Sequence, residues 1–207
     1  MSDKGNAIAY SKGDFSDSNG YFVSNLLSNF PHIREIIDLG CGPADIPIML
    51  AKARPKLKIT AIDASAEMIK IARKKIKSNS LQNSIRLAKM RIPNSRIKKD
   101  KYDAVISKDL LHHLPDSMAV WNEAKRISKK GAVIYVMDLC RPKSKKQARE
   151  MVEKILKNGH PLLKRDFYNS LCAAFTLGEV RGQLRKAGLK LRVSRAGNRH
   201  FIVKGRM

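Results

Sequence analysis

The chain has 207 residues, of which 43% are hydrophobic, so it is long enough for one α/β domain with a real core and too short for two full domains. Its three cysteines are an odd number without a CxxC pair, so the sequence supports neither a disulfide framework nor a zinc knuckle and fits a reducing compartment. No apolar run approaches the roughly 20 residues of a membrane span, and the N-terminus lacks a signal-peptide pattern. We therefore expect a soluble, cytoplasmic protein without a metal; the sequence leaves its oligomeric state open.

The formal net charge of +24 is confined to one part of the chain. Residues 1–66 contain 7 basic and 7 acidic side chains, whereas residues 67–207 contain 35 basic and 11 acidic ones. A field of this size attracts anions, such as nucleic acid, membrane headgroups or phosphorylated metabolites. It is equally explained by solvated basic helix faces, because the basic residues are spread widely and form no dense arm.

Short apolar runs alternate with stretches of helical periodicity, which predicts a parallel sheet covered by helices. Helices are predicted near 21–29, 44–53, 66–77, 117–128, 144–157 and 177–187. Strands are predicted at 35–39, 58–63, 85–87, 104–107, 132–138, 190–195 and 200–204. The last two strands form an antiparallel hairpin, because Gly197 and Asn198 between them tolerate tight turns.

A glycine-containing turn, Asp38-Leu39-Gly40-Cys41-Gly42, follows the first predicted strand and leads into a helix. Its glycines allow a sharp turn and close approach of a ligand at the carboxyl end of the strand. A dinucleotide fingerprint needs a third glycine where this chain has Asp45, and there is no P-loop lysine. The turn therefore favours a nucleoside ligand without phosphates, and Asp38 suits a cationic group on that ligand.

The second predicted strand ends in Asp63, which lies 21 positions after Gly42 and at the same edge of the sheet. A carboxylate at this place can accept hydrogen bonds from both hydroxyls of a ribose. Asp is also a common helix N-cap, so Asp63 alone would be weak support. Its spacing from the glycine turn predicts a nucleoside site.

The chain resembles the class I S-adenosylmethionine-dependent methyltransferases from about residue 10 to its end. Four stretches carry the resemblance: 38–42, 61–65 with Met68, 102–107 leading into His112-His113-Leu114-Pro115-Asp116, and 127–131 before 133–138. The resemblance implies a Rossmann-like, doubly wound seven-stranded sheet that is mostly parallel, with an antiparallel final strand. It also implies S-adenosyl-L-methionine as the cofactor.

The resemblance further implies a cofactor site formed by Asp38, Gly40, Cys41, Gly42, Asp63, Ala64, Met68, Lys89, Met90 and Ser107. Asp38, Gly40 and Gly42 would surround the methionine end. Asp63 would hold the ribose, and Met68 would contact the adenine face. Lys89 stands where the family usually has an acidic residue that accepts from the adenine amine. Since Lys has no acceptor, adenine recognition would depend on backbone groups near Lys89 and Met90.

The acceptor is less determined by the sequence. Methyltransferases that act on base amino groups carry Asn/Asp-Pro-Pro-aromatic after the fourth strand, and this chain has Ser107-Lys108-Asp109-Leu110. Candidates for deprotonating or holding the acceptor are the pair His112 and His113, together with Tyr168, His200 and Arg165. Packing of its own loop is the favoured explanation of the histidine pair, and Tyr168 could belong to the core.

We expect a single domain, in which residues 1–20 form an N-terminal cap and residues 141–175 form an insertion over the acceptor pocket. Tyr10, Phe15 and Tyr21 are the aromatics of the cap, and the stretch around Tyr168 is interpreted as irregular. The predicted activity is methyl transfer to a small-molecule acceptor, with an anionic acceptor favoured by the charge. The alternatives are an RNA methyltransferase, with nucleic acid a less favoured partner, and a non-catalytic S-adenosylmethionine-binding module.

Overall fold

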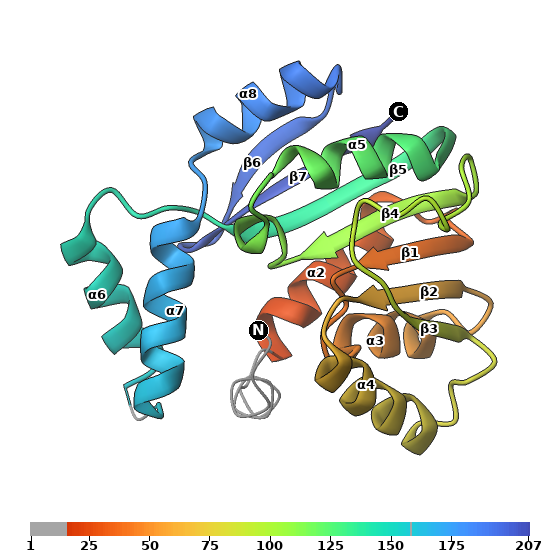
Figure 1. Cartoon of the computed structure of the whole chain (residues 1–207), viewed down its shortest axis with the longest axis horizontal. Helices are drawn as coiled ribbons and strands as arrows, with labels where there is room; N and C mark the ends of the chain where they lie inside the picture. The colour runs from red at the N-terminus through yellow and green to blue at the C-terminus, as the bar shows by residue number, and fades with distance from the viewer. Residues whose placement is uncertain (1–15, 158) are drawn as a thin grey trace.

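A seven-stranded sheet with helices on both faces forms the body of the protein (Figure 1). The structure is a computed structural model that describes residues 16–157 and 159–207. The strands are β1 (Glu35–Leu39), β2 (Lys58–Asp63), β3 (Ile85–Lys89), β4 (Tyr102–Lys108), β5 (Ser128–Leu139), β6 (Arg192–Ala196) and β7 (His200–Arg206). The helices are α2 (Ser16–Asn29), α3 (Asp45–Ala53), α4 (Ala66–Ser78), α5 (Met118–Ile127), α6 (Lys145–Ile155), α7 (Pro161–Ala173) and α8 (Leu177–Ala187), with a 3₁₀ turn η1 at Leu111–His113.

The strand order is β3-β2-β1-β4-β5-β7-β6, and β7 runs antiparallel to both of its neighbours. This topology confirms the predicted doubly wound sheet with an antiparallel final strand. The order reverses between β1 and β4, where the chain leaves one half of the sheet for the other. Open α/β sheets bind their ligands at such a switch point, at the carboxyl ends of the strands.

The two faces of the sheet are covered by separate apolar clusters. One cluster joins α2 and α3 to the sheet through residues such as Phe22, Leu26 and Leu50. The other joins α5 and α8 through Trp121 and Leu184, among others. Fully buried strands explain why the sequence of β1, β4 and β5 is nearly continuous in apolar residues rather than alternating.

The connection from β3 to β4 contains no helix. Arg126 of α5 holds it, donating to the carbonyl oxygens of Ile97 and Asn94 at 2.8 Å each. The same guanidinium pairs with Glu123, which is only 2% exposed, at 2.7 Å. The buried charge of Glu123 is therefore compensated by a cation that also fixes the loop.

Three predicted boundaries were wrong in an informative way. α2 begins at Ser16, before the predicted start at 21, and β5 begins at Ser128 rather than 132. The polar residues before Ala132 suggested a turn, but Ser128 pairs with Tyr102 across a register shift, so the strand starts earlier. At the other end, β7 continues to Arg206, beyond the predicted 204.

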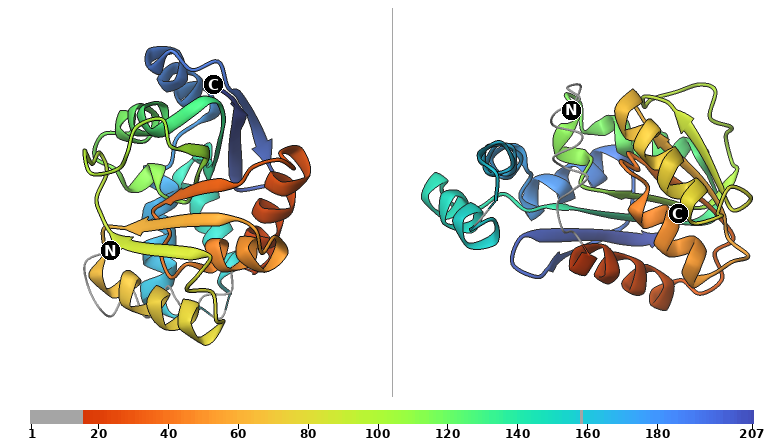
Figure 2. Two further views of the ribbon diagram at one scale, coloured as in Figure 1. Left: turned by 90° about the vertical axis from the view of Figure 1, so that its right-hand side faces the viewer. Right: turned by 90° about the horizontal axis from the view of Figure 1, so that it is seen from below.

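The segment around Tyr168 is helical, which corrects the prediction that it is irregular. His160 is the N-cap of α7, and its Nδ1 accepts the N–H of Leu162. Pro161 occupies the first turn of the helix. Proline is favoured there because the first N–H groups of a helix lack intrahelical partners. α6 and α7 pack against each other as a hairpin that extends beyond the carboxyl edge of the sheet (Figures 1 and 2). Among the described residues, no helix combines the length and apolar composition needed to cross a bilayer.

Candidate active site

The glycine turn after β1 is fixed by β2. The N–H groups of Gly40 and Cys41 both donate to the carbonyl oxygen of Ile62 at 2.9 Å. Gly40 and Gly42 have φ angles of 75° and 52°, a conformation that costs other residues energy. A Cβ on Gly40 would lie 2.8 Å from the Leu110 side chain, whereas one on Gly42 would meet nothing within 4 Å. Gly40 therefore allows close packing, and Gly42 exposes backbone to a ligand.

Asp63 lies against this turn, as its spacing predicted. Its Oδ2 accepts the N–H of Gly42 at 2.9 Å, and its Oδ1 accepts the N–H of Ser65 at 2.8 Å. Each carboxylate oxygen has a second lone pair, so both keep the capacity to accept from a ribose hydroxyl. The side chain is half-buried and therefore held firmly while it remains accessible.

Asp38, near the end of β1, is a buried carboxyl group that lines a pocket beside the turn. Burial raises its pKa to about 8, the charge of Asp63 adds to the effect, and Lys108 opposes it. A cationic group of a ligand would restore the ionised form of this carboxyl. Asn19 of α2 and Lys108 of β4 also line the pocket, and sequence reasoning did not assign either of them to the site.

The predicted adenine side is formed where β2 and β3 end. Lys89 stands opposite Asp63 in the parallel register, and the N–H of Met90 donates to the Asp63 carbonyl at 2.9 Å. Met68 is 2% exposed, and its N–H bonds to Ser65 Oγ at 3.3 Å as part of the cap of α4. Ala64 is exposed at the mouth of this region.

Two of the predicted cofactor residues, Ser107 and Cys41, are buried beside the glycine turn. Ser107 is 1% exposed and donates from Oγ to the Leu39 carbonyl at 2.8 Å, tying β4 to the end of β1. Cys41 is also buried, and burial raises the pKa of its thiol well above the ordinary value. Neither side chain offers an open polar group, so their contribution is to the shape of the turn.

His200 lies next to the end of β4, although the sequence separates them widely. It is 5% exposed, and its Nε2 is 3.5 Å from Asp109 Oδ1. Asp109 has an αL backbone with φ 55° and also pairs with Lys108. Burial alone would raise the pKa of Asp109, but Lys108 and His200 hold it well below its usual range. Strained backbone of this kind clusters at functional sites.

The other two predicted catalytic residues have different surroundings. The His113 ring is 4.0 Å from that of His112, and desolvation followed by the charge of His112 lowers the pKa of His113 to about 4. Tyr168 lies within the α6–α7 hairpin, with the Arg149 guanidinium 5.8 Å from its ring. The structure does not bring Tyr168 into contact with His200 or His113.

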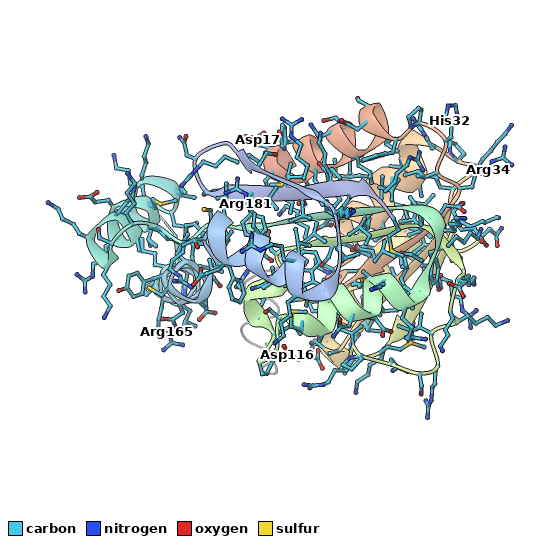
Figure 3. The ribbon with its side chains drawn as sticks, turned by 90° about the horizontal axis from the view of Figure 1, so that it is seen from above. Asp17, His32, Arg34, Asp116, Arg165 and Arg181 are labelled. Carbon is cyan, nitrogen blue, oxygen red and sulfur yellow. The ribbon has the colours of Figure 1, made fainter. Side chains whose placement is uncertain are left out.

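Neither Arg165 nor Tyr21 lines the pocket beside Asp38. Arg165 is at the outer surface of α7, with its side chain 64% exposed (Figure 3). Tyr21 of α2 is 45% exposed. Tyr10 and Phe15 lie outside the described residues, so the proposed cap remains a prediction. The α6–α7 hairpin does lie at the edge of the sheet where the site is, and α7 contacts the η1 turn.

The chain belongs to the family described as "Methyltransferase domain", whose profile matches residues 34–188. It is 29% identical over 110 residues to a demethylmenaquinone methyltransferase from Geobacillus stearothermophilus, a match that covers 53% of this chain and 47% of that protein. It is 27% identical over 128 residues to a ubiquinone biosynthesis O-methyltransferase from Pseudoalteromonas translucida, covering 60% and 52%. The chain thus spans about half the length of these curated relatives.

The fold is that of S-adenosylmethionine-dependent methyltransferases. A protein of Methanococcus maripaludis described as a putative methyltransferase of this type superposes with a TM-score of 0.78 at 22% identity, covering 98% of this chain and 93% of that one. The family indicates S-adenosylmethionine as the cofactor. The residues at the site fit it, because a buried carboxyl suits the ammonium group and Asp63 keeps free lone pairs for the ribose.

Proposed function

We propose that this protein transfers the methyl group of S-adenosylmethionine to a small-molecule acceptor that carries an anionic group. The observation that carries the proposal is the 2.9 Å hydrogen bond by which Asp63 receives the N–H of Gly42. It joins the exposed turn and a ribose-binding carboxylate at the switch point of the sheet. When bound, the cofactor supplies an electrophilic methyl group on its sulfonium.

The contribution of the chain to this reaction is mainly positioning. Asp38 would hold the ammonium of the methionine moiety and Asp63 the ribose, so the cofactor would be held on both sides of its sulfonium. Ser107 ties the end of β4 to the carbonyl of Leu39, which fixes the end of β1 where the glycine turn begins. Holding two reactants in a productive orientation and excluding water can supply much of the rate enhancement.

The acceptor chemistry is argued from the charges around the cofactor pocket. Lys108 lines the pocket beside Asp38, and the part of the chain from residue 67 onward has a net charge of +24. A positive field raises the local concentration of small anions. Of the two relatives named above, one is by its name a methyltransferase of demethylmenaquinone and the other an O-methyltransferase of ubiquinone biosynthesis, which supports a small-molecule acceptor.

The test is transfer of labelled methyl groups from S-adenosylmethionine to a panel of hydroxybenzoates, each paired with its neutral methyl ester. We expect transfer to the acids with a clear preference over the esters. Lys108→Met should reduce that preference, while Lys145→Met on α6, which does not line the pocket beside Asp38, serves as the charge-matched control. Equal rates for acids and esters would contradict an anionic acceptor, and cofactor binding without any transfer would favour the non-catalytic module.

An RNA methyltransferase is the second candidate, favoured by one feature of the α6–α7 hairpin. Residues 141–165 contain 9 Lys and Arg side chains against 2 Glu, and the hairpin projects from the body at the edge where the site lies (Figure 2). A projecting basic element beside a cofactor site can contact phosphates. Aromatic residues make up only 6% of the chain, however, so stacking platforms for bases are few.

A further inference from the structure

The tip of the α6–α7 hairpin carries aliphatic side chains that the fold leaves uncovered. The tip comprises residues 154–157 and 159–165, where α6 ends and α7 begins. Ile155 is 40% exposed and Leu162 is 37% exposed, and they are two of the four large hydrophobic side chains that are exposed among the described residues. Leu156 and Leu163 next to them are only partly buried. Exposed apolar side chains that gather at one place, rather than singly, indicate an interaction surface.

The same segment is basic. It contains no Asp or Glu and four basic side chains: Lys154, Lys157, Lys164 and Arg165. Lys154 and Lys157 are exposed around the end of α6, beside Ile155. The tip therefore presents aliphatic and cationic side chains together.

Backbone and side-chain contacts fix the shape of the tip. The N–H of Gly159 donates to the Leu156 carbonyl oxygen at 2.8 Å, and a Cβ on Gly159 would lie 2.9 Å from the Leu156 Cβ. Lys164 of α7 pairs with Glu153 of α6 at 2.6 Å, which joins the two helices next to their connection. A folded tip loses little conformational freedom on binding, so its exposed side chains are suited to a contact.

The apolar interior of the hairpin does not include the tip. It consists of Leu139, Ala148, Val152, Leu171 and Ala174. The hairpin extends beyond the carboxyl edge of the sheet (Figures 1 and 2), and within residues 16–157 and 159–207 nothing completes the burial of Ile155 and Leu162. Their remaining apolar area is available to another molecule.

Charge and apolar character together select the partner. Residues 141–165 have a net charge of +7, so two copies of this chain would repel each other at the hairpin. RNA would pair with the basic side chains but leave the aliphatic ones in water, and residues 154–165 contain no Phe, Tyr or Trp on which a base could stack. A bilayer with anionic headgroups satisfies both requirements, because its surface is negative and an apolar layer begins within about 5–10 Å.

We propose that the hairpin tip docks on an anionic membrane surface, with Ile155 and Leu162 at the acyl boundary and Lys154 and Lys157 on the headgroups. The protein lies on the bilayer and does not cross it. Because the hairpin extends beyond the edge of the sheet that carries the candidate cofactor site, docking brings that edge toward the lipid. The proposal goes beyond the proposed function and does not depend on it, since membrane binding is measured without methyl transfer.

The test is flotation of the full chain with vesicles of phosphatidylcholine alone and of an equal mixture of phosphatidylcholine and phosphatidylglycerol. We expect binding to the anionic vesicles only. Ile155→Ser combined with Leu162→Ser should weaken it by about tenfold or more, because two aliphatic side chains no longer leave water. Met207→Ser is the matched control and should bind like the wild type, since Met207 is 38% exposed but follows β7.

Two results of this experiment would overturn the proposal. One is a wild-type protein that does not bind the anionic vesicles. The other is a doubly substituted tip that binds them as well as the wild type, which would leave only general adsorption of a basic protein.

Lys154→Glu combined with Lys157→Glu tests the basic part of the tip. We expect it to lose more vesicle binding than Lys74→Glu combined with Lys77→Glu, which makes the same charge change at exposed positions of α4. Equal losses would show that the overall field rather than the tip binds the membrane, and the proposal would be wrong. A single-stranded RNA oligonucleotide is titrated in parallel. If the tip variant loses RNA binding while no protein binds vesicles, the tip is a nucleic-acid surface instead.

Insertion itself is measured by fluorescence, which does not depend on the serine variants folding. Leu162→Trp places an indole at the tip, and the native Trp121 is fully buried and gives a constant background. The emission of Leu162→Trp should shift to shorter wavelength with anionic vesicles, whereas that of Met207→Trp should not. An unshifted emission of Leu162→Trp would show that the tip stays in water and would contradict the proposal.

Discussion

The backbone N–H of Gly42 donates to Asp63 Oδ2 at 2.9 Å, across 21 positions of sequence. The bond makes one unit of two features that each would be weak alone, a glycine turn after β1 and an acid at the end of β2. A substitution at Gly42 or at Asp63 should therefore disturb the position of the other residue.

Gly40→Ala should destabilise the fold more than Gly42→Ala. Both positions have positive φ, which costs an L-residue about 1–2 kcal/mol, but only at Gly40 would the new Cβ also meet Leu110, at 2.8 Å. The overlap should add about 1–3 kcal/mol. Urea unfolding of both variants measures the difference, and adding Leu110→Ala to Gly40→Ala should recover part of it. Equal losses at the two positions would contradict the packing argument.

Asp38 should make the stability of the cofactor-free protein depend on pH. Its pKa in the folded state is about 8, against an ordinary value of 3.8, so the folded protein favours the protonated form. The stabilisation is complete below the ordinary value and is lost as the pH rises toward 8. Asp38→Asn should remove this loss, so its stability relative to wild type should grow between pH 5 and 8.

The measurement is denaturant unfolding of wild type and Asp38→Asn at several pH values, with Asp116→Asn as an exposed control. A difference between Asp38→Asn and wild type that stays constant with pH would show that Asp38 is not a carboxyl with a raised pKa.

Much of this site was predictable from sequence because its parts are local. Gly40, Gly42 and Asp63 lie at ends of strands whose apolar runs are unmistakable, so their place at one edge follows from parallel topology. The pairing of His200 with Asp109 depends on β7 inserting beside β5, and the bond from His112 to Asp138 depends on how η1 folds back. No local pattern encodes these contacts. α7 was missed although Leu163, Phe167 and Leu171 recur at helical spacing, and only Leu171 of these three is buried in the structure.

Lys89→Asp should tighten cofactor binding. The residue ends β3 opposite Asp63, and an acid there would supply the acceptor for an adenine amine that Lys lacks. One added hydrogen bond corresponds to about 1 kcal/mol, or roughly fivefold in affinity. Calorimetry of this variant is compared with Arg86→Asp, which makes the same charge change elsewhere on β3. Weaker binding in Lys89→Asp alone would show that Lys89 already contributes to the site.

RNA binding should be weak and indifferent to sequence, with dissociation constants of about 10⁻⁴ to 10⁻⁶ M at physiological salt. The basic side chains are spread over helix faces, and total RNA should gain no methyl label. Filter binding at several salt concentrations and label incorporation test this. Label in one purified RNA species that is lost when Lys145 and Lys146 are changed to Glu would favour the RNA methyltransferase.

The most direct test of the account is calorimetric titration of S-adenosylmethionine into the wild-type protein and into Asp63→Ala, with Asp116→Ala as control. We expect the wild type and the control to bind alike. Asp63→Ala should lose about 1–3 kcal/mol of binding free energy, the cost of leaving buried polar partners unpaired. Unchanged affinity in Asp63→Ala would contradict the assignment of this edge of the sheet as the cofactor site.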